Sequence, residues 1–153
     1  MTAGTTEQIN KDQADRERFG FLVNPDLTYR RIVFDDDTAR ETLGGMTGEV
    51  VDVAFDQDGN RFHAIFRPDA VRHGAEPNPV ASLARNTAET DNPEFLTDPT
   101  RAISGPVIFT ARDGASVDER TIDKVLQAIR AVENYRDDNA EEFELWRNAV
   151  KNR

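Results

Sequence analysis

The sequence contains no cysteine. Without thiols the chain has no disulfide framework, no cysteine nucleophile, no iron–sulfur cluster and no thiolate zinc site. Long apolar runs are also missing: no segment approaches the roughly 20 apolar residues that a membrane-spanning helix needs, and the N-terminus lacks the apolar stretch of a signal peptide. The sequence therefore favours a cytoplasmic protein without membrane association, and nothing in it indicates a cofactor.

Side chains that carry chemistry are scarce. The imidazoles are His63 and His73, and the serines are Ser82, Ser104 and Ser116. No serine lies in the G-x-S-x-G turn of a nucleophile elbow, and two imidazoles are too few for a three-histidine zinc site. We therefore assign no catalytic, cofactor-binding or metal-binding residue, and we favour a protein that is not an enzyme.

One enzymatic alternative stays open. The consecutive carboxylates Asp35, Asp36 and Asp37, together with His63 or His73, are the candidate ligands of a metal-dependent hydrolase that works through dispersed carboxylates. A second acidic run, Asp56 to Asn60, resembles the start of a calcium loop. Because its Gly59 is in the fourth place, where the calcium loop needs glycine in the sixth, the run is interpreted as a hairpin turn.

Positive charge is in short supply. The chain has 29 acidic and 19 basic residues, which gives a net charge of −10. This balance disfavours direct binding to nucleic acid, whose recognition depends on basic surfaces. It permits the opposite hypothesis, an acidic protein that mimics the phosphate charge of DNA and inhibits a DNA-binding protein.

The length of 153 residues and the hydrophobic content of 37% are sufficient for one modest core. Residues 1–18 contain few apolar side chains, so their burial cannot offset the entropy of ordering them. We interpret residues 1–18 as a flexible N-terminal arm and residues 19–153 as a single domain.

Four segments have the pattern of β-structure. Residues 19–23 and 28–34 are two candidate strands, separated by the turn residues Asn24, Pro25 and Asp26. Residues 49–66 form the clearest hairpin, because alternating apolar residues precede and follow Asp58-Gly59. Residues 106–110 are a compact apolar run that predicts a strand buried on both faces.

Four segments have helical patterns. One short candidate follows Asp35-Asp36-Asp37-Thr38 and runs to about Leu43, and residues 80–85 are a second. Residues 117–135 carry an apolar stripe at steps of three and four. Ser116 and Glu119 predict a capping box at the start of that long helix, and Asn139 with Glu142 predicts the start of a second helix over residues 139–151. The fold class is therefore α+β, with a small antiparallel or mixed sheet covered by the C-terminal helix.

The last helix carries a second apolar stripe, which includes Phe143, Trp146 and Val150. These side chains either complete the core or form a contact with a partner, including a second copy of the chain. Unless they are all buried in the monomer, they are the candidate contact residues of an interaction domain or a homodimer.

The order of several short motifs resembles a known group of proteins. Leu43-Gly44-Gly45 precedes the strand of residues 50–55, Asn78-Pro79-Val80-Ala81 follows a loop, and Gly105-Pro106-Val107-Ile108 leads to the helix that starts near Ser116. Over residues 28–132 this pattern is similar to small domains of unknown function encoded by phages, plasmids and integrated elements. The N-terminal arm, residues 86–100 and the last helix depart from it. The resemblance implies an accessory or host-interaction role and supplies no catalytic residues.

These observations favour a non-enzymatic protein-interaction or accessory protein whose partner is an unidentified protein. The metal-dependent hydrolase and the acidic DNA mimic remain the alternatives.

Overall fold

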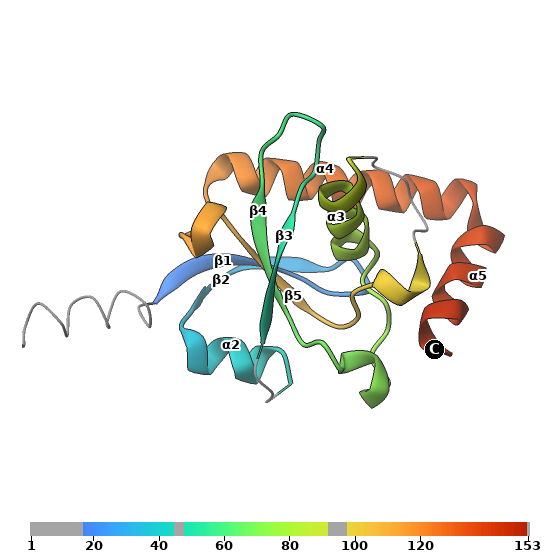
Figure 1. Ribbon diagram of the computed structural model, residues 1–153, viewed down its shortest axis with the longest axis horizontal. Coiled ribbons are helices and arrows are strands. Elements are labelled where there is room, and N and C mark those ends of the chain that lie inside the picture. The colour runs from blue at the N-terminus through green and yellow to red at the C-terminus, as the bar shows by residue number, and fades with distance from the viewer. Residues whose placement is uncertain (1–16, 45–47, 92–97, 153) are drawn as a thin grey trace, which may run out of the picture.

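The computed structural model describes residues 17–44, 48–91 and 98–152. These residues form an α+β fold built on a five-stranded antiparallel sheet (Figure 1). The strands are β1 (Arg18–Val23), β2 (Tyr29–Phe34), β3 (Glu49–Val53), β4 (Phe62–Phe66) and β5 (Val107–Thr110), in the spatial order β2-β1-β5-β4-β3. Figure 1 shows a strong twist, with β1 and β2 running across the direction of β3 and β4.

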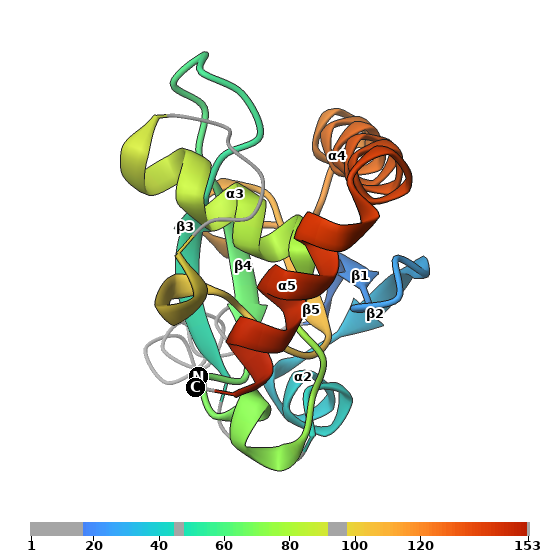
Figure 2. The ribbon, with the colours of Figure 1, turned by 90° about the vertical axis from the view of Figure 1, so that its right-hand side faces the viewer.

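Helices cover both faces of this sheet. The α-helices are α2 (Asp36–Thr42), α3 (Pro79–Thr90), α4 (Glu119–Asp138) and α5 (Ala140–Lys151), and short 3-10 turns occur at η1 (Ala70–His73), η2 (Pro99–Arg101) and η3 (Arg112–Gly114). The main core lies between the sheet and the pair α3 and α4, and a smaller core lies between the opposite face and α2. Figure 2 shows α3 and α4 on separate sides of the helical layer, with α5 in front.

The predicted hairpin of residues 49–66 is confirmed. Strands β3 and β4 pair antiparallel with Val51 opposite Ala64, so the alternating apolar residues share one face. Val53, Phe62, Ala64 and Phe66 are buried in the main core, as the period of two side chains requires. Ile65 points to the other face and joins the smaller core.

The long C-terminal helix is also confirmed. Its stripe places Ile122, Val125, Ile129 and Val132 in the main core. The helix covers residues 119–138 rather than 117–135. The predicted capping box is wrong, because Asp118 is the N-cap and its Oδ1 accepts a hydrogen bond from Thr121 N at 2.8 Å.

Ser116 and Glu119 have other partners. The Ser116 hydroxyl accepts a hydrogen bond from Phe19 N at 3.1 Å, and Arg31 Nη2 donates to Glu119 Oε1 at 2.9 Å. Both side chains therefore bind to the β1–β2 hairpin instead of to the helix end. A contact across the fold has replaced the local one that the sequence spacing suggested.

The start of α5 departs from prediction in the same way. Asn139 precedes the helix, but its side chain makes no capping hydrogen bond; its Nδ2 donates to Tyr135 O at 3.3 Å. Glu142 accepts a hydrogen bond from the Tyr135 hydroxyl at 2.9 Å. Both side chains thus bind to the end of α4 and fix the corner between the two helices.

The region between residues 67 and 101 contains more helix than the sequence indicated. The candidate of residues 80–85 is part of α3, which continues to Thr90. Thr87 is buried and its hydroxyl donates to Leu83 O at 2.9 Å. Of the predicted N-terminal arm, residues 1–16 lie outside the described residues, as do residues 45–47, which include Gly45 of the motif Leu43-Gly44-Gly45.

Candidate functional site

Two hollows between the described residues lie on the side of the sheet that carries α3, α4 and α5. The first, the α3–α4 pocket, has a volume of about 290 Å³ and lies between α3, α4 and the residues that follow β3. The second, the α5 groove, has a volume of about 700 Å³ and lies between α5, the β1–β2 turn and the segments around Pro77 and Pro106. The groove is lined by Asn24, Pro25, Asp26, Leu27, Ala75, Glu76, Pro77, Gly105, Pro106, Arg136, Ala140, Phe143, Glu144, Trp146 and Arg147.

One buried side chain holds three segments of the groove together. Asn78 is fully enclosed, and its Nδ2 donates to Val23 O and to Gly105 O, both at 3.0 Å. Its Oδ1 accepts a hydrogen bond from Ala81 N at the start of α3. A buried amide satisfied at all of these positions fixes one arrangement of the chain. Asn78 therefore sets the position of the adjacent Pro77 against the end of β1.

Backbone pairing completes this wall. Gly105 N donates to Glu76 O at 2.9 Å, and Asn78 N donates to Ile103 O at 2.8 Å. Pro77 lies opposite Ser104 in an isolated β-bridge. Prolines have a fixed φ and no N–H, so Pro77 and Pro106 add rigid apolar surface without an unsatisfied donor.

The β1–β2 turn forms the facing side. Leu27 adopts a positive φ of 73° and is buried in the main core, while Asp26 Oδ1 accepts hydrogen bonds from the backbone N–H and the hydroxyl of Thr28. These bonds lower the pKa of Asp26, so the carboxylate is ionised at neutral pH. The turn is thus a fixed element of the groove.

The α5 wall contains two of the three side chains that the sequence selected. Phe143 is half-buried and Trp146 is 6% exposed, and their ring centroids are 6.0 Å apart. Both line the groove, whereas Val150 is buried and does not. The stripe therefore packs on the chain's own core and presents its aromatic pair to the groove. A contact of these residues with a partner stays a prediction.

Ion pairs surround the groove. Arg147 donates to Glu76 Oε1 at 2.6 Å and to Glu144 Oε1 at 2.7 Å, and Lys151 Nζ donates to Glu76 Oε1 at 3.0 Å. The hydrogen bond from Arg147 is the main reason why the pKa of Glu76 is lowered. Arg136 also lines the groove, and its ion pair with Asp137 is a long one of 3.9 Å.

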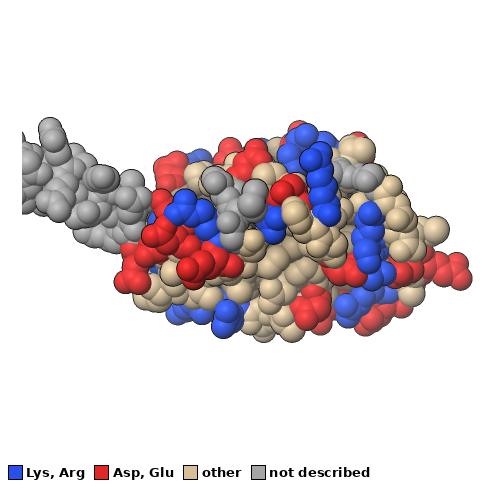
Figure 3. Space-filling view, turned by 90° about the horizontal axis from the view of Figure 1, so that it is seen from below, with Lys and Arg blue, Asp and Glu red and all other residues tan. Residues whose placement is uncertain are grey.

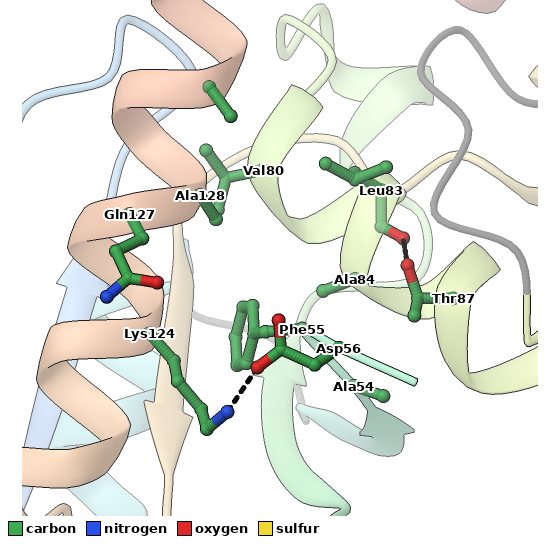
Figure 4. Close-up of a pocket in the computed structure, with 11 residues that line it drawn as sticks. Ala54, Phe55, Asp56, Val80, Leu83, Ala84, Thr87, Lys124, Gln127 and Ala128 are labelled. Atoms are coloured by element: carbon green, nitrogen blue, oxygen red, sulfur yellow. Dashed lines mark hydrogen bonds and ion pairs between the residues drawn. The ribbon is translucent and has the colours of Figure 1, made fainter. Parts of the chain in front are cut away.

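The α3–α4 pocket has mostly apolar walls (Figure 4). They come from Ala54 and Phe55 after β3, from four residues of α3 and from residues 127, 128 and 131 of α4. At one side, Lys124 of α4 extends its ammonium group toward Asp56, with which it forms an ion pair. Asp58 on the same loop is 3.2 Å from the Lys124 Nζ.

The pKa of the Asp58 carboxyl group departs from its ordinary value. Its pKa is lowered to about 2, first by the hydrogen bond from Asn60 N and then by Lys124. The run from Asp56 to Asn60 thus binds an ammonium group of the protein itself, in a hairpin turn. Sequence reasoning missed Lys124 because it is 66 residues from Asp58.

The residues of the hydrolase hypothesis lie in separate contacts. Asp35 is the N-cap of α2, where its side chain accepts from Thr38 N, and Asp37 pairs with Arg40 of the same helix. His63 lies 3.3 Å from Asp52, and His73 lies 3.3 Å from Asp69. Within residues 17–44, 48–91 and 98–152, no three His, Asp or Glu side chains are grouped to hold a metal ion.

The serines have structural contacts. Ser82 is buried, donates to Asn78 O at 2.8 Å and accepts from Ile103 N at 3.0 Å, and Ser104 is buried beside the Pro77 bridge. Acidic and basic side chains are interspersed on the face shown in Figure 3, whereas a DNA mimic needs one contiguous acidic surface.

Comparison with protein-family models, curated proteins and solved structures gives no match to this chain. None of the helices in the part of the chain that the structure describes combines the length and the apolar composition of a membrane span.

Proposed function

We propose that this chain is a non-enzymatic protein-interaction domain that binds a segment of a partner protein in the α5 groove. The observation that carries the proposal is the groove itself, a hollow of about 700 Å³ with proline and aromatic walls. Binding sites are typically concave, mostly apolar and of roughly 300–1,000 Å³, with a few polar groups that fix orientation. The α5 groove has each of these properties.

The rigidity of the groove walls supports the proposal that the groove is a binding site. Pro25, Pro77 and Pro106 have a fixed φ, and the Asn78 side chain joins the segment of Pro77 to Val23 and to Gly105 through two hydrogen bonds. A site that is already ordered spends little of its binding energy on ordering itself. The aromatic pair Phe143 and Trp146 adds the large, stiff side chains that dominate recognition surfaces.

The charges of the rim indicate the chemistry of the partner. Arg147 is compensated by Glu76 and Glu144, whereas Arg136 is partly exposed and its ion pair with Asp137 measures 3.9 Å. We expect a partner segment with one large apolar side chain, which enters the groove, and a nearby Asp or Glu, which binds Arg136. Charge-assisted contacts of a guanidinium with a carboxylate supply this specificity.

The accessory role in a phage or mobile element, which the motif resemblance implies, is part of the same proposal and stays a prediction. So does the homodimer, which would place a second copy in the groove. The metal-dependent hydrolase and the DNA mimic stay alternative predictions, and the groove supports neither.

The test begins with a displayed library of random peptides selected on the full chain. Enriched peptides are then titrated while the fluorescence of Trp146 is recorded, because the chain has one tryptophan and it lines the groove. We expect an aromatic or aliphatic residue close to Asp or Glu in the enriched sequences. Phe143→Ala and Arg136→Glu should each weaken binding by about tenfold or more.

Leu145→Ala is the matched control, since Leu145 is on the same helix but is 71% exposed and outside the groove. It should leave the affinity unchanged. The proposal is refuted if the selection enriches no peptide, or if enriched peptides bind the Phe143 and Arg136 variants as tightly as the unmodified chain. Size-exclusion chromatography of the unmodified chain separates the homodimer from a peptide complex.

A further inference from the structure

We infer that the α3–α4 pocket is a second binding site, which accepts a small organic cation: an amine whose apolar body enters the pocket and whose ammonium group pairs with Asp56. This inference does not depend on the function proposed for the α5 groove. It follows from three observations: the apolar shape of the pocket, the excess of carboxylates over ammonium groups at its edge, and the Phe55 ring next to Asp56.

The pocket exists because small residues face one another across it. Ala54, Ala84, Ala128 and Ala131 come from three different segments, and each side chain ends at its Cβ. Leu83 and Val80 of α3 complete the apolar wall, as Figure 4 shows. The resulting volume of about 290 Å³ is close to the lower end of the range for small-molecule sites.

Carboxylates outnumber ammonium groups at the edge of the pocket. Lys124 and Asp56 are the charged residues among those that line it, and Asp58 is the second carboxylate on the Lys124 ammonium group. Two carboxylates therefore share one ammonium group. The local charge is −1, and Asp58 is ionised at neutral pH because its pKa is about 2.

A ligand cation corrects this imbalance, whereas a ligand anion increases it. The Lys124 ammonium group can retain its ion pair with Asp58, which is 3.2 Å away. The Asp56 carboxylate is then able to pair with the ammonium group of the ligand. Asp56 is half exposed and belongs to a hairpin loop, so this exchange requires little movement. A carboxylate ligand would instead compete with two existing carboxylates for one ammonium group.

The Phe55 ring adds a second attraction for a cation. Phe55 lines the pocket next to Asp56, and Figure 4 shows its ring beside the ion pair. It is held in place by Phe62 and Phe109, with ring centroids 5.6 Å away in each case. The face of a fixed aromatic ring attracts a cation that lies over it.

The test compares three ligands with the same body and different head groups: phenylpropylamine, phenylpropanol and phenylbutyrate. Each is titrated into the isotope-labelled full chain while two-dimensional amide spectra are recorded. We expect the amine to bind, with shifts concentrated at residues 54–56, 83–87 and 127–131. The alcohol and the carboxylate should bind at least about tenfold more weakly, which corresponds to about 1.4 kcal/mol.

Three variants locate the effect. Asp56→Asn should weaken the amine by about tenfold and leave the alcohol unchanged. Asp123→Asn removes the same charge from an exposed position on α4 outside the pocket, and it should leave both affinities unchanged. Ala131→Leu places extra atoms in the pocket from a half-buried position, and it should weaken all ligands that bind there.

Three results would overturn the inference: no binding of the amine at millimolar concentration, equal binding of amine and carboxylate, or amine shifts that map to the α5 groove. Each differs from a failure of the peptide experiment, because that experiment reads Trp146, and Trp146 does not line the α3–α4 pocket.

Discussion

Replacement of Asn78 is expected to cause a large loss of stability. The loss comes from hydrogen bonds that are no longer made and not from the removal of a large apolar side chain. In Asn78→Ala the carbonyl oxygens of Val23 and Gly105 each lose a donor, and α3 loses its N-cap acceptor. Asn78 is 0% exposed, so bulk water does not reach these groups. The two unsatisfied carbonyls cost roughly 1–3 kcal/mol each, and the lost cap costs about 1 kcal/mol.

The sum is a loss of about 3–7 kcal/mol in the free energy of unfolding, against a total of roughly 5–15 kcal/mol for a domain. Urea denaturation followed by circular dichroism measures it. With an m-value of about 1.5 kcal/mol/M, the midpoint should fall by about 2–5 M. Asn148→Ala is the control, because Asn148 is exposed on α5 and such changes stay within about 0.5 kcal/mol.

Asn78→Asp separates the two contributions. Aspartate keeps the acceptor for Ala81 N, but it directs a carboxylate oxygen at two carbonyl oxygens instead of an amide donor. At neutral pH it should destabilise the fold at least as much as alanine does. A loss below about 1 kcal/mol in both variants would refute the reasoning, because it would mean that the carbonyls find other donors at little cost.

Two further predictions concern local packing and capping. Gly20→Ala should lower the free energy of unfolding by about 1–3 kcal/mol, because a Cβ at Gly20 would lie 2.6 Å from Ile108 Cγ2 and 2.7 Å from Phe34 Cε1. Thermal denaturation measures this loss. An unchanged melting temperature would contradict the prediction. Asp118→Ala should cost about 1 kcal/mol, because Asp118 caps α4, and Ser116→Ala should cost less, since the bond that it loses is exposed. The reverse order in urea denaturation would restore Ser116 as the functional cap. Because hydrogen bonds from Thr121 lower the pKa of Asp118, its contribution should be complete above the unfolded pKa and be lost as the pH falls through the folded value.

The local elements of this fold could be predicted from the sequence because their causes are local. The hairpin of β3 and β4 follows from alternation around Asp58-Gly59, and the stripe of α4 follows from a period of 3.6. The end of α3 was underestimated because Thr87 and Thr90 are weak helix formers. In the structure Thr87 is buried, and both hydroxyls donate to carbonyls four residues earlier.

The sheet order and the hollows could not be predicted, because they depend on contacts between distant residues. Strand β5 lies between β1 and β4, although 40 residues separate it from β4 in sequence and still more separate it from β1. The α5 groove combines residues 24–27, 75–77, 105–106 and 136–147. The wrong prediction of the α4 cap has the same cause. Ser116 and Asp118 are each followed, three positions later, by a residue that can complete a capping box. The Ser116 hydroxyl binds Phe19 N instead, and Asp118 caps the helix.

Net charge is a poor guide to the partners of this chain, and the two hollows show why. The total of −10 would suggest cationic partners everywhere, but long-range fields are screened within about 8 Å at physiological ionic strength. At contact distance the local pairing matters more. Lys124 faces two carboxylates, so the α3–α4 pocket has an excess of negative charge. Arg136 faces one carboxylate at 3.9 Å, so the α5 groove retains a cation that a partner can use. The same acidic chain is therefore expected to select an amine at one site and an acidic side chain at the other.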